Sequence, residues 1–371
     1  MGGKLVVSPC LLIFLISFTS VTYFSKAQDS SSPGKATAMY VFGDSLVDVG
    51  NNNYLKVSLA KANFPHNGVD FPTGKATGRF SNGKNAADFV AAKLGLPTAV
   101  PYLSIKKSLS QNTNALISGV SFASGGAGVF NGTDELFKQS VPLTKQVEFY
   151  TLVYNELVQE MGLGAAEQHL SKSIFPIVIG SNDLFGFFKS GSDVSKKNTP
   201  QQYVDSMVAA VNVVLKRLRD LGARKFMIVG IGAIGCTPSQ RVQNKSEVCN
   251  EQVNFWAKKY NDGLTSVLKA FKSEFKDINY SYFDAYSVFV DFIQNPSTYG
   301  FTEVKAACCG LGQLKAKVPC IPISTYCPNR NDHLFWDLYH PTQKAAGLFV
   351  DIIFQGSKYV TPMNVNQLVA V

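Results

Sequence analysis

The sequence predicts an α/β fold: a single domain with a doubly wound, mainly parallel five-stranded sheet flanked by helices. Five short apolar or β-branched runs each end in turn residues, as strands buried on both faces of a parallel sheet do. Segments of helical periodicity separate these runs, and such alternation predicts right-handed crossovers. Because no composition break or internal repeat divides the chain, we expect one domain over 28–371 with short flexible termini.

The strand runs end in Gly, Ser, Asn or Asp, and apolar residues recur every three or four positions in the helical segments. The expected strands are 38–42, 119–123, 174–179, 225–229 and 278–283. The expected helices are 85–94, 143–161, 201–221, 249–275 and 342–354. In a parallel sheet the ligand site lies at the carboxyl ends of the strands. The residues that follow each strand are therefore the first place to look for chemistry.

The first 27 positions have the pattern of a secretory signal peptide. Lys4 precedes an apolar core at 10–18, and Ser25 and Ala27 place small residues at a cleavage site. A membrane anchor is disfavoured because a spanning helix needs about 20 mostly apolar residues. No later segment has that character, so we expect a secreted, soluble mature protein without a transmembrane segment.

The net charge of the chain is +9, and two of these charges, Lys4 and Lys26, lie in the signal. The remaining basic residues are scattered and form no stripe with aromatic residues. This pattern indicates a solvated basic surface and no nucleic-acid partner. Weak attraction to acidic polymers or anionic interfaces is compatible with it. The sequence contains no signal for an oligomeric state.

Six cysteines remain once Cys10 leaves with the signal: Cys236, Cys249, Cys308, Cys309, Cys320 and Cys327. An even number in a secreted protein predicts disulfides, although many pairings are allowed. Chain proximity favours Cys236 with Cys249, and the 308–309 pair with Cys320 and Cys327. No CxxC motif is present, so we expect neither a metal nor a cofactor. Three sequons are glycosylation candidates: Asn131, Asn244 and Asn279.

Ser45 is the candidate nucleophile because it follows the first strand through a Gly-Asp turn, which would expose its hydroxyl at the sheet edge. The alternative is an unreactive helix N-cap. No serine lies in a G-x-S-x-G motif, which disfavours the nucleophile elbow of α/β-hydrolases.

A serine hydrolase also needs a base, and four histidines are available. His340 follows Asp337 by three positions, so the carboxylate can fold back onto Nδ1 and leave Nε2 facing the serine. A structural alternative is a cap on the last helix. His333 beside Asp332 is the second candidate, although adjacent side chains more often point apart. The other two histidines are expected at the surface, His66 on a loop and His169 on a helix.

Three groups are candidates for the oxyanion hole. Asn182 can donate a side-chain N–H, and Gly126 and Ser45 can donate backbone N–H groups. Taken singly, these residues can be explained as an Asx-turn and as tight-turn glycines. Together they place Ser, Gly and Asn at three successive strand ends, followed later by Asp-x-x-His, which favours an acyl-transfer site.

The combination resembles the plant GDSL esterase/lipase family of the SGNH-hydrolase superfamily, over about residues 39–354. The matching blocks are 42–53 (FGDSLVDVGNNN), 78–83 (GRFSNG), 123–128 (ASGGAG), 180–183 (GSND), 235–238 (GCTP), 308–310 (CCG) and 337–342 (DLYHPT). The first and last blocks are highly specific. The sequence differs from the usual family pattern at 121–122 and 232–234. These differences affect the expected strand packing and leave open whether Gly125 or Gly126 is the oxyanion donor.

The resemblance implies a flavodoxin-like SGNH-hydrolase fold. It also implies Ser45 as nucleophile, Asp337 and His340 as its partners, and Ser45, Gly126 and Asn182 as oxyanion donors. The expected activity is hydrolysis of a lipid or other small-molecule ester through an acyl-enzyme. The expected location is the wall or apoplast, and a vacuolar location is also compatible with a signal peptide. An acyltransferase would need the same triad, and a non-catalytic binding protein would tolerate its loss. The sequence identifies neither the natural ester nor its acyl-chain length.

Overall fold

Four parallel strands form the centre of the computed structural model, which describes residues 1–3, 36–133 and 139–371. They are β1 (Phe42–Gly43), β4 (Ile174–Val178), β5 (Lys225–Val229) and β6 (Asn279–Phe283). The short strand β11 (Val360–Thr361) adds antiparallel to β6, giving the order β1-β4-β5-β6-β11. Residues 33–371 form one unit. Most of the predicted signal peptide, 1–27, lies outside the described residues.

The predicted strand at 119–123 is not one of these five. Its core, β3 (Val120–Ser121), pairs with β2 (Val100–Pro101) in a separate two-stranded ladder. It still borders β1, because Val41 N–H donates to the carbonyl of Val120 at 3.0 Å and Phe122 N–H donates to that of Val41 at 2.8 Å. The fifth strand is β11 instead, which is too short for its sequence to show a period.

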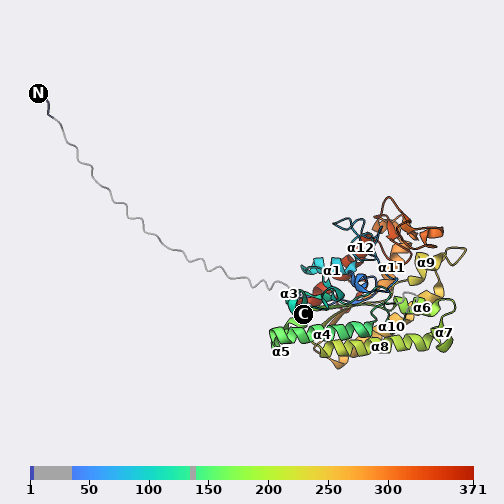
Figure 1. Ribbon diagram of the computed structural model, residues 1–371, viewed down its shortest axis with the longest axis horizontal. Coiled ribbons are helices and arrows are strands. Elements are labelled where there is room, and N and C mark those ends of the chain that lie inside the picture. The colour runs from blue at the N-terminus through green and yellow to red at the C-terminus, as the bar shows by residue number, and fades with distance from the viewer. Residues whose placement is uncertain (4–35, 134–138) are drawn as a thin grey trace. The chain divides into compact units, whose positions relative to one another are not determined.

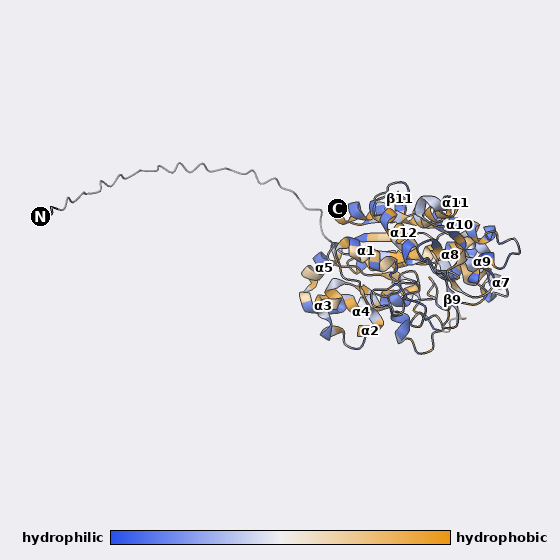
Figure 2. Ribbon diagram, turned by 90° about the horizontal axis from the view of Figure 1, so that it is seen from above, coloured by the Kyte–Doolittle hydropathy of each residue, from blue (hydrophilic) through white to orange (hydrophobic). Residues whose placement is uncertain are grey.

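Helices cover both faces of the sheet (Figure 1). On one face lie α4 (Leu143–Met161), α8 (Pro200–Asp220) and α10 (Glu251–Glu274), which share one hydrophobic core with the strands. On the other lie α1 (Ala86–Leu94), α11 (Ala285–Gln294) and α12 (Gln343–Gln355), which share the second core. The helices show both hydrophilic and hydrophobic colours in Figure 2, as amphipathic helices that cover a sheet should. The doubly wound α/β fold is confirmed.

The two faces differ because strand side chains alternate with a period of two. Large aromatic residues occupy the first face, where the rings of Tyr40 and Phe175 stack with centroids 5.4 Å apart. Their sequence neighbours, among them Met39, Ile174 and Met227, belong to the second core.

The helices predicted at 85–94, 143–161, 201–221, 249–275 and 342–354 are present with ends that agree within two residues. Local chemistry sets these ends: Asn85 and Thr342 accept backbone N–H groups as N-caps of α1 and α12, and Thr199 does so before Pro200 in α8. The remaining elements are short: α2 (Tyr102–Ile105), α3 (Thr113–Ser118), α5 (Leu163–Ser171), α6 (Ser181–Phe188), α7 (Asp193–Lys197), α9 (Pro238–Arg241), α13 (Val365–Ala370), β7 (Glu303–Ala307), β8 (Cys309–Gly310), β9 (Thr325–Tyr326) and β10 (His333–Phe335).

Three disulfides form between neighbours in sequence, as chain proximity predicted. They are Cys236–Cys249, Cys308–Cys327 and Cys309–Cys320. The last two cross-link the loops around β8 and β9, where the four cysteines pack with buried Trp336. Among the described residues, no helix combines the length and apolarity needed to cross a bilayer.

The expectation that His169 lies at the surface is wrong. It is only 9% exposed, and its Nε2 lies 3.2 Å from the hydroxyl of Tyr40 on the aromatic face of the sheet. Burial lowers the pKa of His169 below its usual value. The side chain lies on the inner side of α5, a helix too short for its period to be recognised in the sequence. His66 does lie in a loop, but it is half-buried.

Candidate active site

Ser45 lies in the turn that follows β1, and buried groups hold this turn in place. The side-chain carbonyl of Gln146 on α4 accepts the N–H of Gly43 at 2.8 Å, and its amide group donates to the carbonyl of Gly43 at 2.8 Å. A side chain at Gly43 would not fit, because its Cβ would lie 2.4 Å from the carbonyl oxygen of Val178. Ser45 is therefore a turn residue at the sheet edge and does not cap a helix.

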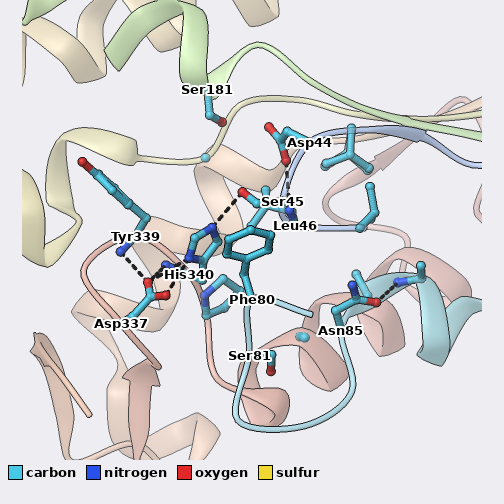
Figure 3. A pocket seen from close by; sticks show the side chains of 18 of the residues that line it. Asp44, Ser45, Leu46, Phe80, Ser81, Asn85, Ser181, Asp337, Tyr339 and His340 are labelled. Atoms are coloured by element: carbon cyan, nitrogen blue, oxygen red, sulfur yellow. Dashed lines mark hydrogen bonds and ion pairs between the residues drawn. The ribbon is translucent and has the colours of Figure 1, made fainter. Parts of the chain in front are cut away.

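Ser45, His340 and Asp337 form a continuous hydrogen-bonded chain (Figure 3). The Oγ of Ser45 lies 2.7 Å from Nε2 of His340. The Nδ1 of His340 lies 2.8 Å from each carboxylate oxygen of Asp337. The structure thus brings together the three residues that the sequence singled out, across a separation of 295 positions between serine and histidine.

A tight loop between β10 and α12 presents Asp337 and His340. The N–H groups of Tyr339 and His340 both donate to Oδ1 of Asp337, at 2.9 and 2.8 Å, which folds the Asp-x-x-His segment back on itself. Burial acts to raise the pKa of Asp337, but the facing imidazole and these hydrogen bonds outweigh burial and hold the pKa below its ordinary value. The carboxylate is therefore charged where it faces Nδ1.

Two further side chains border the triad. The ring of Phe80 lies against the imidazole of His340, with ring centroids 5.0 Å apart. Asp44, next to Ser45, is 1% exposed and receives the N–H of Leu46 at 3.0 Å. Burial raises the pKa of Asp44 to about 7, against the partial opposition of that hydrogen bond and of His340.

Ser45, Gly126 and Asn182, the predicted oxyanion donors, line the same cavity. Asn182 lies in the first turn of α6 and donates one hydrogen of its amide to the carbonyl of Ala127 at 2.8 Å, which orients the group. Gly126 has φ 77°, a conformation suited to glycine. The N–H of Gly125 donates to Asp48 at 3.0 Å, so the geometry favours Gly126 over Gly125.

His333 and Asp332 do pair, contrary to the expectation that adjacent side chains point apart. The Nδ1 of His333 lies 2.6 Å from Oδ1 of Asp332. This pair does not line the cavity that contains Ser45; it lies where β10 meets β7, with the carbonyl of Asp332 accepting the N–H groups of Thr302 and Glu303. Its position indicates that the pair belongs to the contact between β7 and β10 and not to the site around Ser45.

The loops around Ser45 are joined by buried polar side chains that have no place in the predicted triad or oxyanion hole. Asp48 accepts N–H groups from Gly50, Asn51 and Gly125. The amide of Asn51 donates to the carbonyls of Ser121 and Ala123, and that of Asn52 donates to those of Ala60 and Gly125. The run of three asparagines at 51–53 was the signal available in the sequence. Gln146, on the outer side of the turn, had no such signal.

No group of three or more His, Cys, Asp or Glu side chains suited to a metal ion occurs among residues 1–3, 36–133 and 139–371. The three candidate glycosylation sites differ in exposure. Asn131 and Asn244 are exposed, whereas Asn279 begins β6, is half-buried and accepts a hydrogen bond from Lys272.

Comparison with known proteins places the chain in a family. Residues 39–353 match the model of the GDSL-like lipase/acylhydrolase family. The chain belongs to this family. A GDSL esterase/lipase of Arabidopsis thaliana is 46% identical to it over 98% of both chains. A second from the same plant is 37% identical over 90% of this chain and 92% of its own, and a third is 38% identical over 97% of both.

In this GDSL family member, the clamp on the nucleophile turn can be tested with Gln146→Leu. The change leaves the buried N–H of Gly43 without its partner, whereas the carbonyl still accepts the N–H of Ser124 at 3.0 Å. We therefore expect the free energy of unfolding to fall by about 1–3 kcal/mol. Urea denaturation measures the loss. Gln159→Leu, an exposed change on the same helix, is the control and should leave stability within about 0.5 kcal/mol of wild type. Equal stability of the two variants would contradict the role assigned to Gln146.

Buried Asp44 should make stability depend on pH. Because its pKa is about 7 in the folded protein and about 3.9 when unfolded, the folded state holds the extra proton between these values. Its contribution to the free energy of unfolding therefore falls as pH rises from about 4 to about 7. Asp337, whose pKa is lowered, acts oppositely and loses its stabilisation only at lower pH.

Urea denaturation at several pH values between 4 and 8 should show a smaller decline with pH for Asp44→Asn than for wild type. Asp193 is on the surface, so Asp193→Asn is the matched control. Its free energy of unfolding should decline with pH as steeply as that of wild type over this range. An unaltered decline in Asp44→Asn would show that Asp44 is ionised in the folded protein at pH 5.

Proposed function

We propose that the protein is a carboxylic-ester hydrolase that acts through an acyl-enzyme on Ser45, with His340 as base and Asp337 as the group that orients it. The observation that supports this most directly is the hydrogen-bonded chain Ser45–His340–Asp337, with Nε2 of His340 2.7 Å from the serine oxygen. Membership of the GDSL family and the esterase/lipase names of its relatives point the same way.

The first half-reaction follows from this geometry. The Nε2 of His340 takes the hydroxyl proton of Ser45 as the oxygen attacks the ester carbonyl. The anionic carboxylate of Asp337 stabilises the imidazolium and fixes its orientation. His340 then gives the proton to the departing alcohol, and a water activated by the same nitrogen releases the acid from Ser45.

The negative oxygen of the tetrahedral intermediate needs donors that are already in place. The N–H groups of Ser45 and Gly126 and the second amide hydrogen of Asn182 are the candidates, since all three residues line the cavity that contains the serine. The bond from Asn182 to the carbonyl of Ala127 holds its amide ready before substrate arrives, so little reorganisation is required.

An acyltransferase would pass the same acyl group to an alcohol, and the triad does not separate the two outcomes. Comparing products with and without an alcohol acceptor does. The third reading, a non-catalytic binding protein, is disfavoured because every member of the triad is present and hydrogen-bonded.

We also propose that the mature protein, 28–371, is a single-domain secreted glycoprotein of the wall or apoplast, with delivery to the vacuole as the other destination. The signal-like first 27 residues and the three disulfides support an oxidising compartment. Exposed Asn131 and Asn244 are better glycan acceptors than half-buried Asn279. The substrate is a lipid or other small-molecule ester.

Ser45→Ala should abolish labelling by an active-site phosphonate and lower kcat on a p-nitrophenyl ester at least about 10⁴-fold, and Asp337→Asn should cost about as much. Ser190→Ala, at an exposed serine beyond α6, is the control and should keep full activity. If Ser45→Ala hydrolyses the ester as fast as wild type does, the enzyme assignment fails.

Asn182→Ala should lower kcat about 10²–10³-fold with little change in KM, because an oxyanion donor acts mainly in the transition state. Steady-state kinetics on the same ester measures both constants. Phosphonate labelling of Ser45 should persist in this variant, which shows that the triad is intact. A rise in KM at constant kcat would instead indicate that Asn182 binds the ground state of the substrate.

A further inference from the structure

The cavity that contains Ser45 does not stop at the triad. It has a volume of about 450 Å³, within the ~300–1,000 Å³ of small-molecule sites. Its lining includes polar side chains such as Ser81 and Asn85 (Figure 3). Its lining then continues beneath the sheet, to residues that belong to the second hydrophobic core.

Strand residues show how far this inner part extends. Met39, Pro176 and Met227 line the cavity, and the strand register sets Pro176 beside Met227 in the middle of β4 and β5. Met39 pairs with Ile174 at the start of β4, four residues before the end of β1. At about 3.3 Å per residue, the cavity runs back from the carboxyl edge by ~13 Å.

The opposite wall is one face of α12. Ala346, Val350 and Ile353 line the cavity at i, i+4 and i+7, the spacing of a single helical face. These three and the strand residues Met39 and Met227 are at most 4% exposed, yet they line open space. Protein interiors are close-packed, with few voids larger than a water molecule, so an apolar space of this size at a reactive serine is suited to a ligand.

We propose that this channel between the sheet and α12 is the acyl-binding site, and that the substrates are esters of long, unbranched fatty acids. The inference rests on the proposed function, since it places the acyl carbonyl at Ser45. The chain would extend away from the serine along α12, and its alcohol would stay on the loop side. A polar acyl group or a sugar finds no hydrogen-bonding side chain on the Met39, Met227 and α12 walls, whereas each buried methylene gains free energy there.

The position of a blocking side chain along α12 should set the longest chain that fits. Ala346 and Ile353 are seven residues apart, ~10 Å along the helix. We expect kcat/KM of wild type on p-nitrophenyl esters from acetate to palmitate to rise by up to about fourfold per methylene until the channel is filled. Ala346→Phe should end this rise at short chains, and Ile353→Phe should end it only at longer ones.

Leu348→Phe, on the same helix but outside the cavity lining, is the matched control and should keep the wild-type profile. A binding measurement separates this inference from the enzyme assignment. In the Ser45→Ala background, laurate should raise Tm, and adding Ala346→Phe should remove that shift. The channel would be overturned if wild type hydrolyses the acetate but neither blocking variant alters the chain-length profile, and laurate gives no shift in Tm. The serine mechanism would then still stand. Inactivity of wild type on every ester would overturn the proposed function instead.

Discussion

The carboxyl edge of one parallel sheet is the constraint on which the site depends. Strands β1 and β4 end there side by side, so the turn with Ser45 and the first turn of α6 with Asn182 meet without any long loop. The last block of the chain completes the site from outside the sheet, through β10 and the loop to α12. The bond from Ser45 to His340 joins residues 295 positions apart, and it forms because α12 packs on α1 next to β1.

The motif blocks contain far more structural residues than reactive ones. In the block 42–53, Ser45 is the proposed nucleophile, and its neighbours hold the edge loops together. Asp48 ties its own loop to Gly125, while Asn51 and Asn52 satisfy carbonyls on the loops that flank it. Buried polar groups are costly unless paired, so such a network tolerates one arrangement of the loops. This gives Ser45, Gly126 and Asn182 a rigid common frame.

Much of this could be predicted from the sequence. Buried strands and long amphipathic helices have strong periodic signals, and α4 begins and ends at the expected residues. The sequence also singled out the three residues that the structure joins by hydrogen bonds, because a serine hydrolase needs a fixed set of groups and the chain has few histidines. The errors have physical causes: β11 has two residues, His169 lies on a short helix, and the pairing of His333 with Asp332 depends on rotamers. Gln146 acts through the fold alone, so no local pattern marks it.

The two faces of the sheet show how stability and a binding space coexist in one domain. Aromatic side chains fill the α4–α8–α10 face, where Tyr40, Phe42 and Phe175 surround Tyr150 and are almost fully buried. Close packing on that side supplies burial of apolar area. The α12 side also contains aromatic rings, such as Phe289 and Phe349. Its strands contribute Met39 and Met227 where the other face has Tyr40 and Phe226, and this side is not filled. An unfilled core costs stability in proportion to the volume of the cavity. The free energy gained by packing on the α4–α8–α10 face therefore has to exceed the cost of the cavity on the α12 face. Because strand residues alternate between the faces, one short strand supplies both: Tyr40 belongs to the packed side, and Met39 and Val41, its neighbours, line the space that opens at Ser45.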